Sequence, residues 1–146
     1  MHGRRGYTLI EILVVLALLA LAIGIEYPGT RAASDAWAVR AARDAVAASL
    51  AGARAAALTQ RGAEVLLVPD VGTVLIRAGE ALPVPRLELT RDWGVALRSP
   101  GFGGDTISIR YDALGVGRIA NRTLRFERGR AVAGLTVSAY GRVRSW

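Results

Sequence analysis

Cysteine and lysine are absent from this chain of 146 residues, and the only histidine is His2. Without cysteine the chain can form neither a disulfide framework nor a thiolate metal site. His2 lies in a short basic segment before the first apolar run, so removal of that segment leaves no histidine for catalysis. The serines and threonines then have no neighbouring imidazole to activate them as nucleophiles. We expect a protein that is not an enzyme and that needs no cofactor or metal.

Two features that can indicate a ligand site are incomplete. The glycine-bearing segment Gly101–Gly104 lacks the Lys-Ser/Thr ending of a phosphate-binding loop. Asp92, Asp105 and Asp112 stand apart, whereas calcium sites gather their carboxylates closely. Turn residues flank Asp112, so we expect its carboxylate to bond the backbone of its own turn.

An uncharged apolar run, Ile12–Ile25, dominates the N-terminal part of the chain. With Tyr7–Glu11 it makes 19 residues carrying a single charge, close to the ~20 residues that span a bilayer core. The small residue suited to cleavage is Gly6, which precedes the run, whereas an ordinary secretory signal is cut after its apolar run. Cleavage at Gly6 therefore keeps the apolar segment. Arg4 and Arg5 favour a cytoplasmic N-terminus, with the rest of the chain outside.

Glu11 is the one charge within this segment. A carboxylate inside the apolar layer costs on the order of 2.5 kcal/mol or more unless it finds a partner. One interpretation is therefore functional, with Glu11 paired to a cation. The alternative is that Glu11 lies near the membrane interface and extends its carboxylate into water.

The sequence Gly6-Tyr7-Thr8-Leu9-Ile10-Glu11, followed by the apolar run, resembles the class III signal of type IV pilins and type II secretion pseudopilins. The resemblance implies that a prepilin peptidase cuts between Gly6 and Tyr7 and methylates the new amine of Tyr7, a position where the family more often has Phe. It also implies that Glu11 pairs with the N-terminal amine of a neighbouring subunit. Its implied partners are major and minor pseudopilins and the inner-membrane assembly platform. The implied location is the inner membrane, crossed once, with the globular domain in the periplasm.

An alanine-rich segment from Thr30 to Gln60 continues the apolar run. Its apolar residues recur at helical spacing and its charged residues fall elsewhere, which predicts an amphipathic helix. Gln60-Arg61-Gly62 is a stop signal in which Gly62 suits the left-handed cap. Pro28 can kink this helix or mark a simple surface kink. We expect Trp37 to serve as a core anchor rather than a contact to neighbours.

Beyond Gly62 the periodicity changes to short β-rich runs separated by turn residues. The predicted strands are Glu64–Pro69, Thr73–Arg77, Arg86–Thr90, Val95–Arg98, Thr106–Tyr111, Thr123–Glu127 and Leu135–Ser138. The expected fold class is α+β, a long N-terminal helix packed on an antiparallel, β-sandwich-like domain. The expected divisions are a leader at 1–6, a transmembrane part at 7–29, an amphipathic part at 30–62 and a β-rich domain at 63–146.

The C-terminal half carries most of the excess positive charge. From Leu97 to Trp146 nine arginines face three acidic residues, an excess that attracts polyanions. The half from Ile109 to Arg144 resembles the globular domain of the minor pseudopilin H family, which also includes the pilus minor pilin FimT. Within it, Gly141-Arg142-Val143-Arg144 matches a GRxR pattern that is linked to DNA binding in FimT-like pilins. On a strand, Arg142 and Arg144 would project to the same face.

Two functions fit these observations. The first is a minor pseudopilin of type II secretion, which helps to prime or cap the pseudopilus that exports folded proteins. The second is a pilus subunit that captures DNA during uptake. In the first case Arg142 and Arg144 would contact an acidic partner subunit or form part of a solvated rim. In the second case they would contact phosphates. The favoured hypothesis is the secretion subunit, with nucleic acid as the alternative partner.

Overall fold

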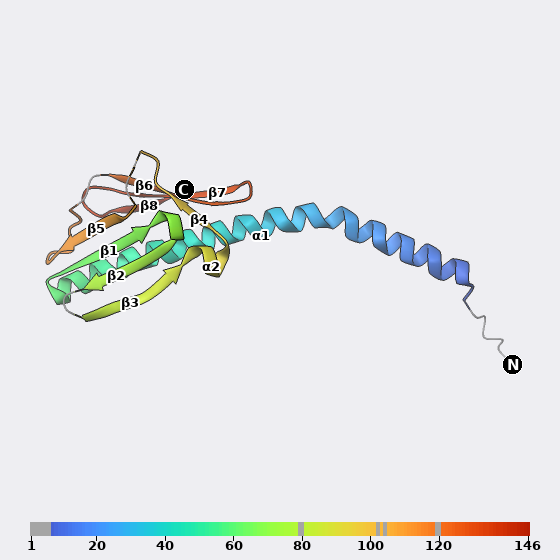
Figure 1. The fold of residues 1–146 in the computed structure, drawn as a ribbon, viewed down its shortest axis with the longest axis horizontal. Coiled ribbons are helices and arrows are strands. Elements are labelled where there is room, and N and C mark those ends of the chain that lie inside the picture. The colour runs from blue at the N-terminus through green and yellow to red at the C-terminus, as the bar shows by residue number, and fades with distance from the viewer. Residues whose placement is uncertain (1–6, 79–80, 102, 104, 119–120) are drawn as a thin grey trace.

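The computed structural model describes residues 7–78, 81–101, 103, 105–118 and 121–146. Within this part, the side chains of residues 23–28 and 81–86 are outside the description. One long helix carries a compact β-rich domain on its C-terminal half and extends far beyond it at its N-terminal half (Figure 1). The expected α+β class with antiparallel sheets is confirmed.

Helix α1, Leu9–Gln60, is 52 residues long and runs through Pro28 without interruption. Within the domain it buries one face, whose members recur three or four residues apart as the helical period requires. These residues are at most 2% exposed: Ala38, Val39, Ala42, Val46, Leu50, Ala53 and Ala57. The helix ends at Arg61, which adopts the left-handed conformation with φ 60° and donates its backbone N–H to the Ala57 carbonyl. The prediction that Gly62 takes this cap is wrong by one residue, since Gly62 has φ 144°.

Two four-stranded antiparallel sheets form from the described residues. The first has the order β3-β2-β1-β5 and the second the order β4-β6-β7-β8. The strands of the first are β1 Gly62–Val68, β2 Thr73–Ala78, β3 Ala81–Glu88 and β5 Ile107–Asp112. Those of the second are β4 Ala96–Arg98, β6 Arg122–Arg128, β7 Ala131–Val137 and β8 Val143–Ser145. A short 3-10 helix, η1 Pro69–Val71, joins β1 to β2, and α2 Leu89–Trp93 follows β3.

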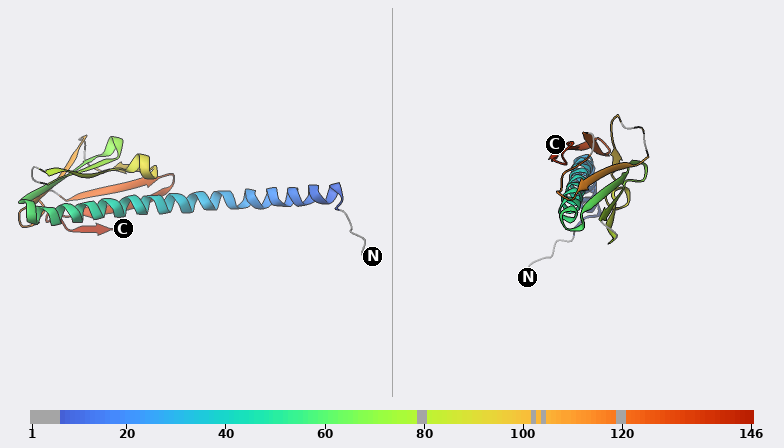
Figure 2. Two further views of the ribbon diagram at one scale, coloured as in Figure 1. Left: turned by 90° about the horizontal axis from the view of Figure 1, so that it is seen from below. Right: turned by 90° about the vertical axis from the view of Figure 1, so that its left-hand side faces the viewer.

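Both sheets pack their apolar faces against α1 (Figure 2). Alternation along the strands explains which residues face the helix, because successive side chains point to opposite faces. In β1 the inner residues Val65 and Leu67 are fully buried, and in β6 Leu124 and Phe126 are. On the outer face of the second sheet Arg125 and Val132 are exposed, whereas Gly134 is buried.

Two further local predictions differ from the structure. The run predicted as strand Arg86–Thr90 divides between the end of β3 and α2. The Glu88 N–H bonds the Asp92 carboxylate, and Gly94 caps α2 in a left-handed conformation, so local hydrogen bonding favours the helix there. Trp37 is 66% exposed, so its expected core role is wrong. Val39, not Trp37, lies on the buried face of α1.

Candidate functional site

The N-terminal end of α1 is a capped helix start. Thr8 has an extended backbone, and its side-chain oxygen accepts a hydrogen bond from the Glu11 N–H at 3.4 Å. A threonine followed three residues later by glutamate is the capping-box pattern. Glu11 therefore sits in the first turn, where the positive end of the helix dipole favours a carboxylate. The sequence interpretation considered only the cost of burying Glu11 and missed its stabilisation by the helix start. The spacing of three residues between Thr8 and Glu11 was the signal for it.

Tyr7 and Glu11 lie together on one side of this helix start. With Ile12, Val15 and Leu16 they line an open hollow of about 370 Å³. Tyr7 is 81% exposed. Gly6, the other partner in the expected cleavage, lies outside the described residues.

The described residues 9–22 of α1 are exposed on every side. The large apolar residues among them are Leu9, Ile10, Ile12, Leu13, Val14, Val15, Leu16, Leu18, Leu19 and Leu21. A helix that is apolar all round needs an apolar environment, and the domain does not cover this one. Among the described residues, no helix combines the length and the apolar character needed to cross a membrane.

Arg142 and Arg144 are both exposed, at the start of the last hairpin strand. Arg144 lies in β8 opposite Thr136 of β7. Arg142 lies just before β8, where its carbonyl accepts from the Ser138 N–H at 2.9 Å and its N–H donates to Ser138 Oγ at 3.0 Å. The structure thus brings both arginines to one sheet edge, although only Arg144 is a strand residue.

Gly141 holds this hairpin in place. Its φ is 78°, and its N–H donates to the Ser138 carbonyl at 2.8 Å. A Cβ atom at Gly141 would lie 2.6 Å from Cε1 of Tyr111, whose ring is buried beneath the turn. A Cβ at Gly117 would lie 2.5 Å from the Gly141 nitrogen, so these two backbones touch. The fold therefore requires glycine at position 141 of the GRxR pattern. From the sequence alone, this residue indicates only a turn.

Tyr111 and Asp112 support the same end of the domain. Burial raises the pKa of the Tyr111 phenol, because desolvation disfavours the phenolate. Asp112 Oδ1 accepts from the N–H groups of Val116 and Leu114, as predicted for its own turn. These hydrogen bonds, that of Val116 first, lower the pKa of Asp112.

The outer face of the second sheet adds further cations. Arg98 pairs with Arg125 across β4 and β6, and Arg125 pairs with Gly134 of β7. The indole of Trp146 covers Gly134, where an added Cβ would lie 2.1 Å from the ring. Sequence reasoning placed only Arg142 and Arg144 on a face, because the register that aligns the other residues cannot be read from spacing.

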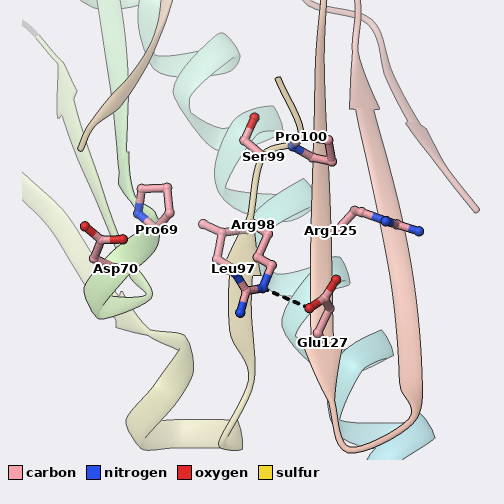
Figure 3. A pocket seen from close by; sticks show the side chains of 8 residues that line it. All are labelled: Pro69, Asp70, Leu97, Arg98, Ser99, Pro100, Arg125 and Glu127. Atoms are coloured by element: carbon pink, nitrogen blue, oxygen red, sulfur yellow. Dashed lines mark hydrogen bonds and ion pairs between the residues drawn. The ribbon is translucent and has the colours of Figure 1, made fainter. Parts of the chain in front are cut away.

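A polar hollow of about 320 Å³ adjoins this face. It is lined by Pro69, Asp70, Leu97, Arg98, Ser99, Pro100, Arg125 and Glu127. Figure 3 shows the Arg98 guanidinium directed at Glu127, 3.0 Å away, while Arg125 turns away from that pair. Glu127 thereby offsets part of the repulsion between the directly opposed arginines.

Within the described chain, no group of three or more His, Asp, Glu or Cys side chains is placed to hold a metal ion. The arrangement instead offers an exposed apolar helix, a capped carboxylate and an arginine-rich sheet face. These are features of binding surfaces.

Comparison with known proteins bears on the N-terminal segment. Residues 1–25 match the family model described as the prokaryotic N-terminal methylation motif. No curated protein and no solved structure gave a match. The motif implies processing by a prepilin peptidase and assembly with other pilins, and it supports a type IV pilin-like protein.

Proposed function

We propose that this protein is a minor pseudopilin of a type II secretion system, a structural subunit and not an enzyme. In this role it is anchored in the inner membrane by α1, holds its β-rich domain in the periplasm and contributes to the tip or assembly of the pseudopilus. The observation that carries the proposal is the methylation motif at the start of an apolar helix that continues unbroken into the domain core.

Processing is the first test. Cleavage between Gly6 and Tyr7 with methylation of Tyr7 should give a protein that has lost residues 1–6 and gained one methyl group. Intact-mass measurement of the membrane-extracted protein checks this in cells with and without prepilin peptidase. A species that keeps His2 in the peptidase-positive cells contradicts the proposal.

Glu11→Ala separates insertion from assembly. Removing a charge from an apolar helix makes membrane insertion easier, so the variant should remain in the membrane fraction. Assembly should fail, because the variant cannot pair with the amine of a neighbouring subunit. Thr8→Ala is the matched control, since it removes the cap but keeps the carboxylate. Secretion by Glu11→Ala equal to that of the unmodified protein excludes a pairing role.

The competing function is a type IV pilus minor pilin that binds DNA for natural transformation. The exposure of Arg142 and Arg144 beside Arg125 and Trp146 favours this candidate. Glu127 and Asp70 beside Arg98 act against it, because these carboxylates repel phosphates. A partner subunit can place anions opposite the arginines and cations opposite these carboxylates, so it suits the mixed charge of this face better than a nucleic acid.

A fluorescence anisotropy titration of the detergent-solubilised full chain with DNA decides between the two. A DNA-binding pilin should bind without sequence preference, and each phosphate contact that Arg142→Ala/Arg144→Ala removes should flatten the log–log salt slope by about 0.9. We expect weak binding at physiological salt that the double substitution leaves unchanged. We also expect the double substitution to reduce co-purification with the other minor subunits. Tight, salt-sensitive and mutation-sensitive DNA binding would establish the competing function.

A further inference from the structure

The hairpin between β6 and β7 lies where α1 leaves the domain (Figure 1). Arg128 and Ala131 close it, and Gly129 and Arg130 form its two-residue turn. Gly129 has φ 57° at the first central position, where hairpin turns of the II′ type take glycine. This turn places Arg130 at the tip, exposed to solvent.

Arg128 fixes the hairpin to the helix. Its Nε lies 3.0 Å from Asp35 Oδ1 of α1, and its Nη1 donates to the Trp93 carbonyl of α2 at 2.7 Å. A Cβ at Gly129 would lie 2.6 Å from Asp35 Oδ2, so the turn backbone rests directly on this carboxylate. The height of the tip along α1 is therefore set by these contacts.

Two hollows flank this junction. One, of about 380 Å³, is lined by Arg31, Ser34, Asp35 and Arg128. The other, of about 450 Å³, is mostly apolar and is lined by Ala32, Asp35, Ala36, Gly129, Arg130 and Ala131. Arg31, Arg128 and Arg130 thus line the two hollows beside Asp35, whose carboxylate is bonded to Arg128. The nearby α2 corner carries a net charge of about −1, since Arg91 pairs with both Glu88 and Asp92 at 3.1 Å.

The positions of Arg31 and Asp35 along α1 give the distance of these arginines from a membrane that holds the N-terminal half of the helix. Arg31 follows the end of the apolar run, Ile25, by six residues, which is about 9 Å of helix at 1.5 Å per residue. Asp35, which holds the hairpin, follows by about 15 Å. The headgroup layer on one side of a bilayer is roughly 5–8 Å thick, and the Debye length at physiological salt is about 8 Å. A helix inserted up to Ile25 therefore places Arg31 within a few Å of the headgroups and Asp35 about one Debye length from them.

We propose that Arg31, Arg128 and Arg130 bind the headgroups of anionic phospholipids on the membrane that holds the N-terminal half of α1. The inference rests on the membrane anchoring in the proposed function. An arginine near an anionic membrane surface strengthens its binding about fivefold. The polar hollow offers guanidinium donors to a lipid phosphate. Docking of the tip fixes the tilt of α1 and the side of the domain that faces the membrane.

The absence of cysteine permits a direct measurement. Val132, two residues beyond the tip and 48% exposed, is replaced by cysteine and labelled with a donor fluorophore. The full chain is placed in nanodiscs that carry headgroup-labelled acceptor lipid. The discs contain either phosphatidylcholine alone or its mixture with phosphatidylglycerol. Energy transfer should be higher in the anionic discs and should fall at high salt.

Arg130→Ala tests the tip without disturbing the contacts of Arg128. The variant should lower the ratio of docked to undocked domain about fivefold in anionic discs. Arg77→Ala is the control. Arg77 is an exposed arginine at the opposite end of the domain, where α1 ends, and it lies opposite Glu64, the third residue of β1. This substitution removes the same charge and should leave energy transfer unchanged.

The outcomes separate the two proposals. Equal energy transfer in neutral and anionic discs, from a chain that has entered both, overturns lipid binding and leaves the anchoring intact; the arginines would then face an acidic neighbouring subunit instead. An equal loss in Arg77→Ala and Arg130→Ala also overturns it, since net charge alone would then explain the effect. A chain that does not enter the discs contradicts the anchoring itself, and lipid binding with it.

Discussion

Two glycines with the same backbone conformation differ in what surrounds them. Gly101 has φ 77° and Gly141 has φ 78°. An added Cβ at Gly101 would meet nothing within 4 Å, whereas at Gly141 it would lie 2.6 Å from the Tyr111 ring. The pair therefore separates the cost of left-handed backbone from the cost of a steric clash.

Gly101→Ala should lower the free energy of unfolding by about 1 kcal/mol, the strain of a side chain in the left-handed region. Gly141→Ala should lower it by about 2–4 kcal/mol, because overpacking against Tyr111 is added to that strain. Urea unfolding of both variants measures the difference. Equal losses would mean that the Tyr111 ring moves aside without cost.

Glu64 is a carboxylate of the first sheet whose ionised form the fold stabilises. Its Oε1 accepts from the Ser108 hydroxyl and from Arg110 Nε, the latter at 2.9 Å. These bonds, that of Ser108 first, lower the pKa of Glu64 below its ordinary value of 4.5. The stabilisation is present above pH 4.5 and is lost as the pH falls through the lowered pKa.

Glu64→Gln should therefore flatten the pH dependence of the melting temperature between about pH 5 and pH 3. Because Arg110 is 71% exposed, water screens its share of the effect. Ser108→Ala should move the acid transition to higher pH by removing the larger cause. A Glu64→Gln profile that runs parallel to that of the unmodified chain would contradict the assignment.

At the scale of elements, α1 presents leucines on both of its faces within the domain. Leu50 is fully buried under the sheets, while Leu58 is 60% exposed near the helix end. Leu50→Ala should lower the free energy of unfolding by about 2–5 kcal/mol, since it opens a cavity in the core. Leu58→Ala should change it by less than about 0.5 kcal/mol. Thermal unfolding of the two variants checks which face of the helix carries the domain.

The sequence was informative where one periodic pattern extends over many residues. The buried stripe of α1 from Val39 to Ala57 follows directly from helical spacing. The short elements were less accessible: β8 has three residues and forms because β7 offers it an edge. The turn to α2 depends on the Glu88–Asp92 hydrogen bond, which competes with the strand propensity of the same run.

The candidate sites divide in the same way. The Tyr7–Glu11 segment is local, so a short motif in the sequence was enough to single it out. The row formed by Arg98, Arg125, Gly134 and Trp146 depends on three strand registers, and spacing along the chain does not determine register. The contact between Arg128 and Asp35 joins residues far apart in sequence and is likewise a product of the fold.

At the scale of the whole molecule, the domain and the N-terminal half of α1 are separable. The described residues 9–22 are exposed throughout, and the buried face of the helix begins at Ala38. A chain that begins at residue 30 should therefore be soluble and should melt at the same temperature as the full chain. A chain that begins at residue 44 also loses the buried Ala38, Val39 and Ala42, which stabilise the fold by about 3 kcal/mol. Its melting temperature should fall well below that of the first; equal melting temperatures would show that the sheets fold without this part of the helix.

Because α1 is continuous, a tilt at its N-terminal end moves the whole domain. The described chain has no flexible linker between Leu9 and the core, because the same 52-residue helix serves both. At 1.5 Å per residue this arm is about 78 Å long, so a 10° change in the tilt of its first turns displaces Gln60 sideways by about 13 Å. A small rotation where the N-terminal half is held therefore becomes a large swing of the domain. Where the tilt of the N-terminal half of α1 is fixed, the arginine-rich sheet face can occupy only a small range of positions.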